Sequence, residues 1–199
     1  MSGDSTVLVV DDEVEMARAY AAWLRESYEA RTAHDGREAL AVVSEDVDVV
    51  LLDRRMPRLS GDEALERMRA RGYDARVAMV TAVDPDFDVV DMPFDTYLTK
   101  PVREAELSDT VETLTELAEY DEAVRAEFAL AEKRAALEAT KPATELSDDD
   151  RFGRLDEKLS TARCDAIDQL GEVDHDTVTS ALSGLSANVD ARHGAVSSW

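Results

Sequence analysis

The sequence has one cysteine and no long hydrophobic run. Cys164 has no second cysteine with which to form an internal disulfide, so a disulfide framework is excluded and a reducing compartment is expected. No apolar stretch approaches the ~18–20 residues that a membrane-spanning helix requires. Residues 1–5 lack the basic and apolar regions of a signal peptide. We therefore expect a cytoplasmic protein with no membrane partner.

Positive charge is also scarce. The 199 residues include 45 acidic but only 22 basic side chains, which gives a net charge of -23. Lysine occurs only four times, at Lys100, Lys133, Lys141 and Lys158. A lysine-poor, acidic composition is typical of proteins kept soluble at high salt, where the Debye length shrinks to ~3 Å and self-repulsion matters little. The composition therefore predicts a halophilic protein.

Four apolar runs in the first half of the chain each end on a residue suited to phosphate or magnesium chemistry. They lead into the pair Asp11 and Asp12, into Asp53, into Thr81 and into Lys100. Short apolar strands that alternate with helices indicate a parallel sheet covered on both faces. Ligands bind outside the carboxyl ends of such strands. We expect an α/β fold with a doubly wound sheet of five strands, five helices, and one shared pocket for these side chains.

Local signals locate three of the helices. The spacing of Val14, Ala17, Ala21 and Leu24 predicts one buried face of a helix that follows Asp12. Gly72 is expected to end the third helix as a C-cap. Two prolines, Pro85 and Pro93, limit the fourth helix to one or two turns near residues 87–91.

The second half of the chain is predicted to be all helical. Residues 103–138 contain no Gly or Pro and form either one long helix or two in near continuity. A break is expected at residues 141–144, and the hydroxyl and carboxylates of residues 147–150 favour a new helix start. The two apolar stripes are expected to face each other in an antiparallel hairpin. Residues 178–189 form a weaker helix candidate.

The motifs VLVVDDE, VVLLDRRMP, MVTA and YLTKP occur in order, each at a predicted strand end. With them, residues 6–119 resemble the receiver domain of two-component response regulators, which has a flavodoxin-like fold. The resemblance implies that Asp53 accepts a phosphoryl group from a sensor histidine kinase. It also implies that Asp11, Asp12, Asp53 and the main-chain carbonyl of Arg55 bind Mg²⁺, which prefers oxygen ligands.

The same resemblance assigns the remaining site residues. Thr81 matches the hydroxyl that binds a phosphoryl oxygen, and Lys100 matches the lysine that pairs with the acyl phosphate. Tyr97 occupies the switch position, so Thr81 and Tyr97 are expected to move on activation. The Lys100–Pro101 peptide is expected to be cis. Arg54, Arg55 and Arg58 form a basic group near the site. They are either scattered solvated charges or residues that dock the kinase or tune the lifetime of the phosphoryl group.

Residues 120–190 resemble the HalX domain, a helical module found after receivers in halophilic archaea. The segments that carry this resemblance are EYDEAVRAEFALAEKRAALEATK and DRFGRLDEKL. The resemblance assigns no activity to the module. Residues 191–199 are expected to form a flexible tail.

Three functions are compatible with these motifs. The first is a phosphorylation-controlled regulator whose helical module contacts an unknown downstream protein or a second copy of the chain. The second is a DNA-binding transcription regulator, which is disfavoured because residues 120–199 contain 17 acidic and 9 basic residues and no basic stripe. The third is an aspartyl phosphohydrolase of the haloacid dehalogenase type. That enzyme would need a second carboxylate where Arg55 stands, so the chain is not expected to be an enzyme.

The halophilic composition yields a first prediction. Transfer from molar to millimolar KCl should loosen the fold, because carboxylate repulsion is then no longer screened. Circular dichroism measured after refolding at both salt concentrations tests it. Identical spectra at the two concentrations would contradict the halophilic interpretation.

Overall fold

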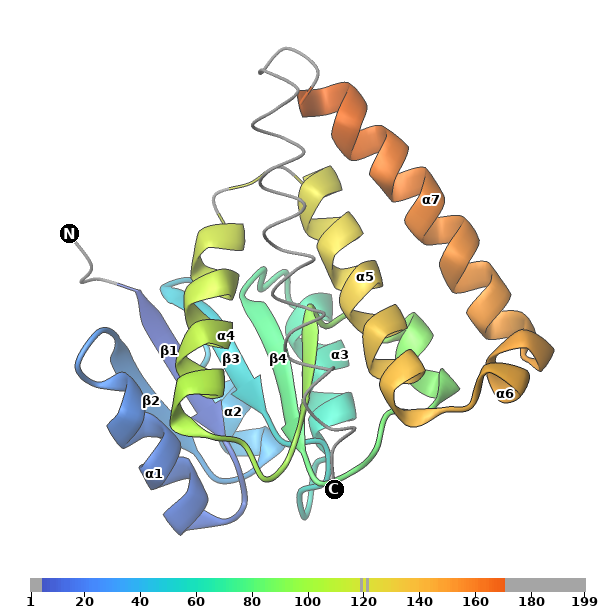
Figure 1. Cartoon of the computed structure of the whole chain (residues 1–199). Helices are drawn as coiled ribbons and strands as arrows, with labels where there is room; N and C mark the ends of the chain where they lie inside the picture. The colour runs from blue at the N-terminus through green and yellow to red at the C-terminus, as the bar shows by residue number, and fades with distance from the viewer. Residues whose placement is uncertain (1–4, 119, 121, 171–199) are drawn as a thin grey trace. The chain divides into compact units, whose positions relative to one another are not determined.

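The computed structural model describes residues 5–118, 120 and 122–170. The chain divides into two compact units. The first unit contains residues up to 84 together with residues 92–119, and the second contains residues 85–91 and the chain from residue 120 onward. Figure 1 follows the chain by colour from blue to red. No helix among the described residues is long and apolar enough to cross a membrane.

A five-stranded parallel sheet forms the centre of the first unit, in the order β2-β1-β3-β4-β5. Its strands are β1 (Thr6–Val10), β2 (Glu29–Ala33), β3 (Val47–Leu52), β4 (Arg76–Thr81) and β5 (Thr96–Thr99). Strands β1, β3 and β4 are buried along almost their whole length. This explains their continuous apolar sequences, because a central parallel strand is covered on both faces.

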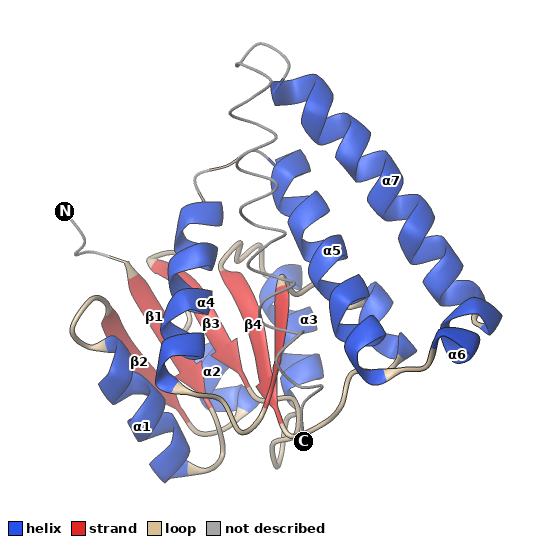
Figure 2. Cartoon of the chain, viewed as in Figure 1, coloured by secondary structure: helices blue, strands red, loops and turns tan. Residues whose placement is uncertain are grey.

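Four α-helices cover the two faces of this sheet (Figure 2). They are α1 (Val14–Leu24), α2 (Gly36–Val42), α3 (Gly61–Ala70) and α4 (Glu104–Leu117). Helices α1 and α4 pack together on one face, and α2 and α3 pack together on the other. Ser60 and Glu63 form a capping box at the start of α3, which satisfies backbone N–H groups that would otherwise have no partner.

The predicted fold class is confirmed, and so are most of the local predictions. Helix α3 ends as expected, with Gly72 at φ 83° just beyond it. The fourth helical element is a single short 3-10 helix, η1 (Phe87–Asp91). The prediction that Val14 lies on the buried face of α1 was wrong. Val14 is exposed, and Tyr20 is buried on that face instead.

The second unit contains η1 and three α-helices, α5 (Glu122–Thr140), α6 (Ala143–Asp148) and α7 (Asp150–Leu170). Helices α5 and α7 pack against each other and run in opposite directions, which confirms the antiparallel hairpin (Figure 1). Residues 118 and 120, between α4 and α5, are not helical, so the second of the two alternatives for residues 103–138 holds.

The connection between α5 and α7 differs from the prediction. Pro142 is the N-cap of α6, so the expected break is only a pause of two residues before a further helix. Proline suits this position because it has no backbone N–H to satisfy. The carboxylate of Asp149 accepts a hydrogen bond from the Arg151 backbone N–H at 2.8 Å, at the start of α7. The candidate helix at residues 178–189 and the tail at 191–199 lie outside the described residues.

Gly61 provides a test of how the fold holds the end of strand β3. A Cβ atom on Gly61 would collide with the main-chain carbonyl oxygen of Asp53. Gly61→Ala should therefore lower the free energy of unfolding by about 1–3 kcal/mol, as overpacking does. Gly153→Ala is the matched control, because nothing lies within 4 Å of its added Cβ. Thermal unfolding in molar KCl measures both, and equal effects of the two substitutions would contradict this account.

Candidate functional site

The parallel sheet brings the predicted site residues to one edge. Asp11 directly follows β1 and Asp53 directly follows β3, while Thr81 ends β4. The Asp53 N–H donates to the Val10 carbonyl at 2.9 Å, and the Lys100 N–H donates to the Thr81 carbonyl at 2.8 Å. These bonds continue the strand pairing past the strand ends, so the backbone of each residue is fixed by its neighbour.

The Lys100 side chain connects the two buried carboxylates. Its Nζ lies 2.6 Å from Asp11 Oδ2 and 3.1 Å from Asp53 Oδ2. The Lys100 and Asp53 side chains are each 10% exposed, and that of Asp11 is 2% exposed. One ammonium therefore compensates two negative charges that burial would otherwise leave costly. The Lys100–Pro101 peptide is cis, as the resemblance implies.

Burial and charge compete at this ion cluster. Burial raises the pKa of Asp11, and the hydrogen bond and charge of Lys100 offset only part of that rise. Burial alone would lower the pKa of Lys100, but its bonds to Asp11 and Asp53 outweigh burial and leave the pKa raised. The pKa values of Asp11 and Lys100 are therefore both raised, the first by loss of hydration and the second by nearby negative charge.

The donor set at the sheet edge fits a hard divalent cation. Asp11, Asp12 and Asp53 each offer a carboxylate oxygen, and these three oxygens lie within 4.8 Å of one another. Asp12 is exposed, whereas Asp11 and Asp53 are buried. Mg²⁺ takes oxygen ligands and keeps several waters, so a mixture of buried and exposed carboxylates suits it. Among the described residues this is the one group of acidic, His or Cys side chains with such spacing.

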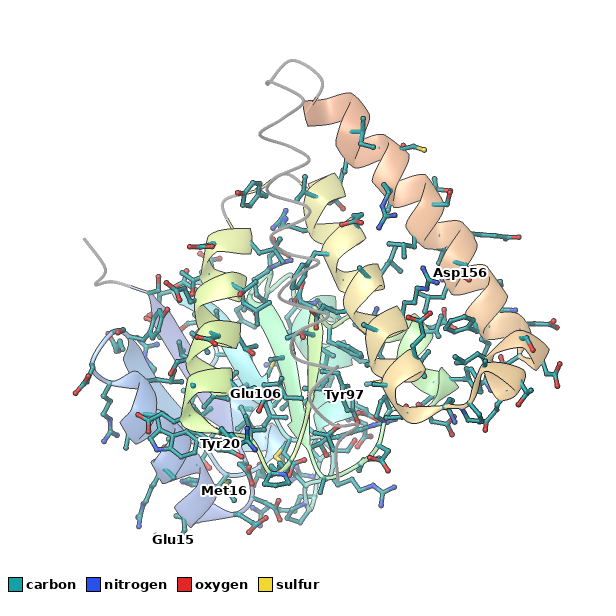
Figure 3. The ribbon with its side chains drawn as sticks, in the orientation of Figure 1. Glu15, Met16, Tyr20, Tyr97, Glu106 and Asp156 are labelled. Carbon is teal, nitrogen blue, oxygen red and sulfur yellow. The ribbon has the colours of Figure 1, made fainter. Side chains whose placement is uncertain are left out.

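Thr81 and Tyr97 lie beside the chain that leaves β4. Thr81 is buried, and its hydroxyl accepts a hydrogen bond from the Val83 N–H at 3.4 Å. Tyr97 projects from β5 and is also buried (Figure 3). Its hydroxyl donates to the Val83 carbonyl at 2.6 Å. The hydroxyls of both expected switch residues therefore bind the backbone of the same residue, Val83.

Two arginines of the predicted basic group have structural partners. Arg54 pairs with Asp62 near the start of α3 at 3.1 Å. The Arg58 Nε donates to Asp35 Oδ2 at 2.8 Å, and Asp35 in turn caps α2. Arg58 adopts φ 68°, an uncommon conformation for a residue other than glycine. The contact between Arg58 and Asp35 was not predicted from the sequence, although the Asp35-Gly36 pair does indicate that Asp35 caps α2.

Comparison with known proteins identifies the family of each part of the chain. The model of the response regulator receiver domain matches residues 7–112, and the chain therefore belongs to that family. The model of the HalX domain matches residues 116–182. The chain thus contains a response regulator receiver domain followed by a HalX domain. Receiver domains bind Mg²⁺ at an acidic pocket and interact with histidine kinases.

Two curated relatives agree with this assignment. A protein of Haloferax volcanii, provisionally named a transcriptional regulator, is 45% identical over 165 residues, which are 82% of this chain and 28% of that protein. The sensory transduction protein RegX3 of Mycolicibacterium smegmatis is 40% identical over 108 residues, 52% of this chain and 47% of RegX3. The chain spans less than half the length of either relative. The Haloferax relative fits the halophilic composition.

Solved receiver structures support the fold. The receiver domain of the Francisella response regulator 1452 is 28% identical with a TM-score of 0.52, covering 58% of this chain and 99% of that one. A CheY-like receiver protein of Methanospirillum hungatei is 27% identical with a TM-score of 0.53, covering 57% of this chain and 96% of that one.

The ion cluster predicts a pH-dependent loss of stability in a Lys100 variant. Lys100→Met leaves Asp11 and Asp53 buried without their cation, which should cost about 3–5 kcal/mol near neutral pH. Because the pKa of Asp11 is raised, the folded protein binds this proton more tightly than the unfolded chain does. The cost should therefore shrink as the pH falls and Asp11 becomes neutral.

Thermal unfolding of both proteins across a pH series in molar KCl measures this difference. Arg18→Met is the control, because the Arg18–Glu15 pair is exposed and such pairs contribute little. A stability difference between wild type and Lys100→Met that stays constant with pH would contradict the role assigned to Asp11.

Proposed function

We propose that this chain is a phosphorylation-controlled response regulator in which Asp53 accepts a phosphoryl group from a sensor histidine kinase. The observation that carries the proposal is the Lys100 ammonium within 3.1 Å of Asp53 and 2.6 Å of Asp11. A buried carboxylate beside a cation and two further carboxylates has the charges that phosphoryl transfer needs.

Each residue has a role in this proposed transfer. A carboxylate oxygen of Asp53 attacks the phosphorus, the phosphorus–nitrogen bond to the kinase histidine breaks, and the imidazole leaves with the bonding electrons and takes up a proton. Lys100 then pairs with the acyl phosphate, and the Thr81 hydroxyl donates to one of its oxygens. Mg²⁺, held by Asp11, Asp12, Asp53 and the Arg55 carbonyl, would neutralise charge that develops on the phosphoryl group.

Protein–protein contact through the helical module is the proposed output. The receiver would comprise residues 6–119 and the HalX-like module residues 120–190. A downstream protein or a second copy of the chain would be the partner, and the chain would have no independent enzymatic activity. DNA binding is the alternative, supported by the transcriptional name of the Haloferax relative. The acidic charge of residues 120–199 opposes it.

Phosphorylation by a small donor tests the proposal directly. Incubation with Mg²⁺ and acetyl phosphate in molar KCl should add one phosphate to the intact mass of the protein. Asp53→Asn should abolish the adduct because the nucleophile is gone, and removal of Mg²⁺ should do the same. Asp84→Asn, an exposed aspartate beyond the end of β4, is the matched control and should retain the adduct.

Two results would count against this function. An absent adduct at every salt concentration would refute phosphoacceptor chemistry, and an adduct that survives Asp53→Asn would refute its location. The phosphorylated sample can also be mixed with genomic DNA fragments in molar KCl. A sequence-dependent gel shift there would favour the DNA-binding alternative over protein–protein output.

A further inference from the structure

The segment between β4 and β5 belongs to the helical unit rather than to the receiver unit. Residues 85–91 group with the chain from residue 120 onward, whereas residues up to 84 and 92–119 form the other unit. The backbone therefore passes between the two units three times, at residues 84–85, 91–92 and 119–120. In Figure 1, η1 is the short green helix beside α5.

Cations of the helical unit hold the first part of this segment. Lys141 Nζ lies 3.0 Å from Asp86 Oδ1 and 4.8 Å from the centre of the Phe87 ring. The guanidinium of Arg151 lies 5.2 Å from the same ring. Phe87 is buried. Cations over an aromatic face attract its negative quadrupole, so Phe87 is bound by charge as well as by burial.

A second contact holds the other end of the segment. Lys158 Nζ of α7 lies 3.2 Å from Asp91 Oδ1. Val89 and Val90, between the two contacts, are buried. We call the three cations Lys141, Arg151 and Lys158, with their partners Asp86, Phe87 and Asp91, the η1 clamp. The clamp holds both ends of η1 against the hairpin that α5 and α7 form.

The use of lysine supports a specific role for this clamp. The chain has only four lysines. One of them, Lys100, connects Asp11 and Asp53, and two more, Lys141 and Lys158, bind acidic residues of the segment 85–91. In a composition that almost excludes lysine, half of the lysines contact this one short segment.

The N-terminal end of the segment 85–91 lies close in sequence to the proposed phosphorylation site. Thr81 ends β4, and Val83, whose backbone binds the hydroxyls of both Thr81 and Tyr97, precedes the helical unit by two residues. The backbone that the Thr81 and Tyr97 hydroxyls bind is therefore only three residues from Asp86, the first residue of the clamp. No intermediate element separates the two.

We infer that the segment 85–91 transmits the phosphorylation state of Asp53 to the helical unit, and that the η1 clamp sets the strength of this coupling. The inference rests on the proposed function. Coupling through an element that two sites share is reciprocal. Loosening the clamp should therefore also change how strongly the receiver retains a phosphoryl mimic, by the same factor.

Hydrogen exchange of the full chain in molar KCl tests the coupling. Mg²⁺ with beryllofluoride serves as the phosphoryl mimic, and uptake is compared over residues 53–61, 83–91 and 141–158. In the wild type the mimic should slow exchange in 53–61 and alter it in the other two regions on the order of fivefold or more. At a saturating concentration of the mimic, Lys141→Gln and Lys158→Gln should each reduce the response of 141–158 and leave that of 53–61 in place.

Arg134→Gln is the matched control. Arg134 pairs with Glu138 and Asp156 on the same hairpin and not with residues 85–91. This variant should keep the full response of 141–158. The Lys158 side chain is 51% exposed and that of Lys141 is 15% exposed, and glutamine keeps most of the length of lysine. Both variants are therefore expected to fold, and a wild-type exchange pattern at 53–61 in the absence of the mimic verifies this in each sample.

The outcomes separate the two proposals. A wild-type response at 53–61 with none at 141–158 would overturn the inference and leave the phosphoacceptor role intact. Full coupling in both clamp variants would also overturn it. The absence of any response at 53–61, together with no acetyl phosphate adduct, would overturn the proposed function and the inference with it.

Discussion

The contact of the Lys100 ammonium with Asp11 and Asp53 is the interaction on which the receiver unit depends. Two buried carboxylates at neighbouring strand ends repel each other and lose hydration, and one cation compensates both. The partners are 89 and 47 residues apart in sequence. They meet only because β1, β3, β4 and β5 are adjacent, parallel and end at one edge. The pairing of these charges therefore requires the sheet order to be correct.

Much of this arrangement could be predicted from the sequence, for a physical reason. Central parallel strands are buried on both faces, so they appear as short apolar runs whose last residue is easy to identify. The polar residues Asp11, Asp53, Thr81 and Lys100 then mark the strand ends. Prolines act locally as well, and Pro85 and Pro93 correctly limited the fourth helix. Their direct backbone effect needs no knowledge of the rest of the fold.

Features set by long-range packing could not be predicted in the same way. The Arg58–Asp35 contact joins two loops whose sequences carry no sign of each other, apart from the cap at Asp35. Pro142 breaks the helical pattern as expected, but its further place as the N-cap of α6 was not predicted. The membership of Phe87 in the helical unit depends on Lys141 and Arg151, more than fifty residues away. Periodicity describes only which face of a helix is apolar, not which distant segment covers it.

The chain crosses between the two units three times, and this limits how one unit could be exchanged for another in evolution. A domain attached at a single junction can be exchanged by joining two genes at one point. Here the helical unit includes Phe87 and Asp91 from within the receiver sequence, as well as the chain after residue 119. Recombination at residue 119 would therefore transfer an incomplete module. An exchange that keeps the helical unit whole would have to carry residues 85–91 together with the chain after residue 119.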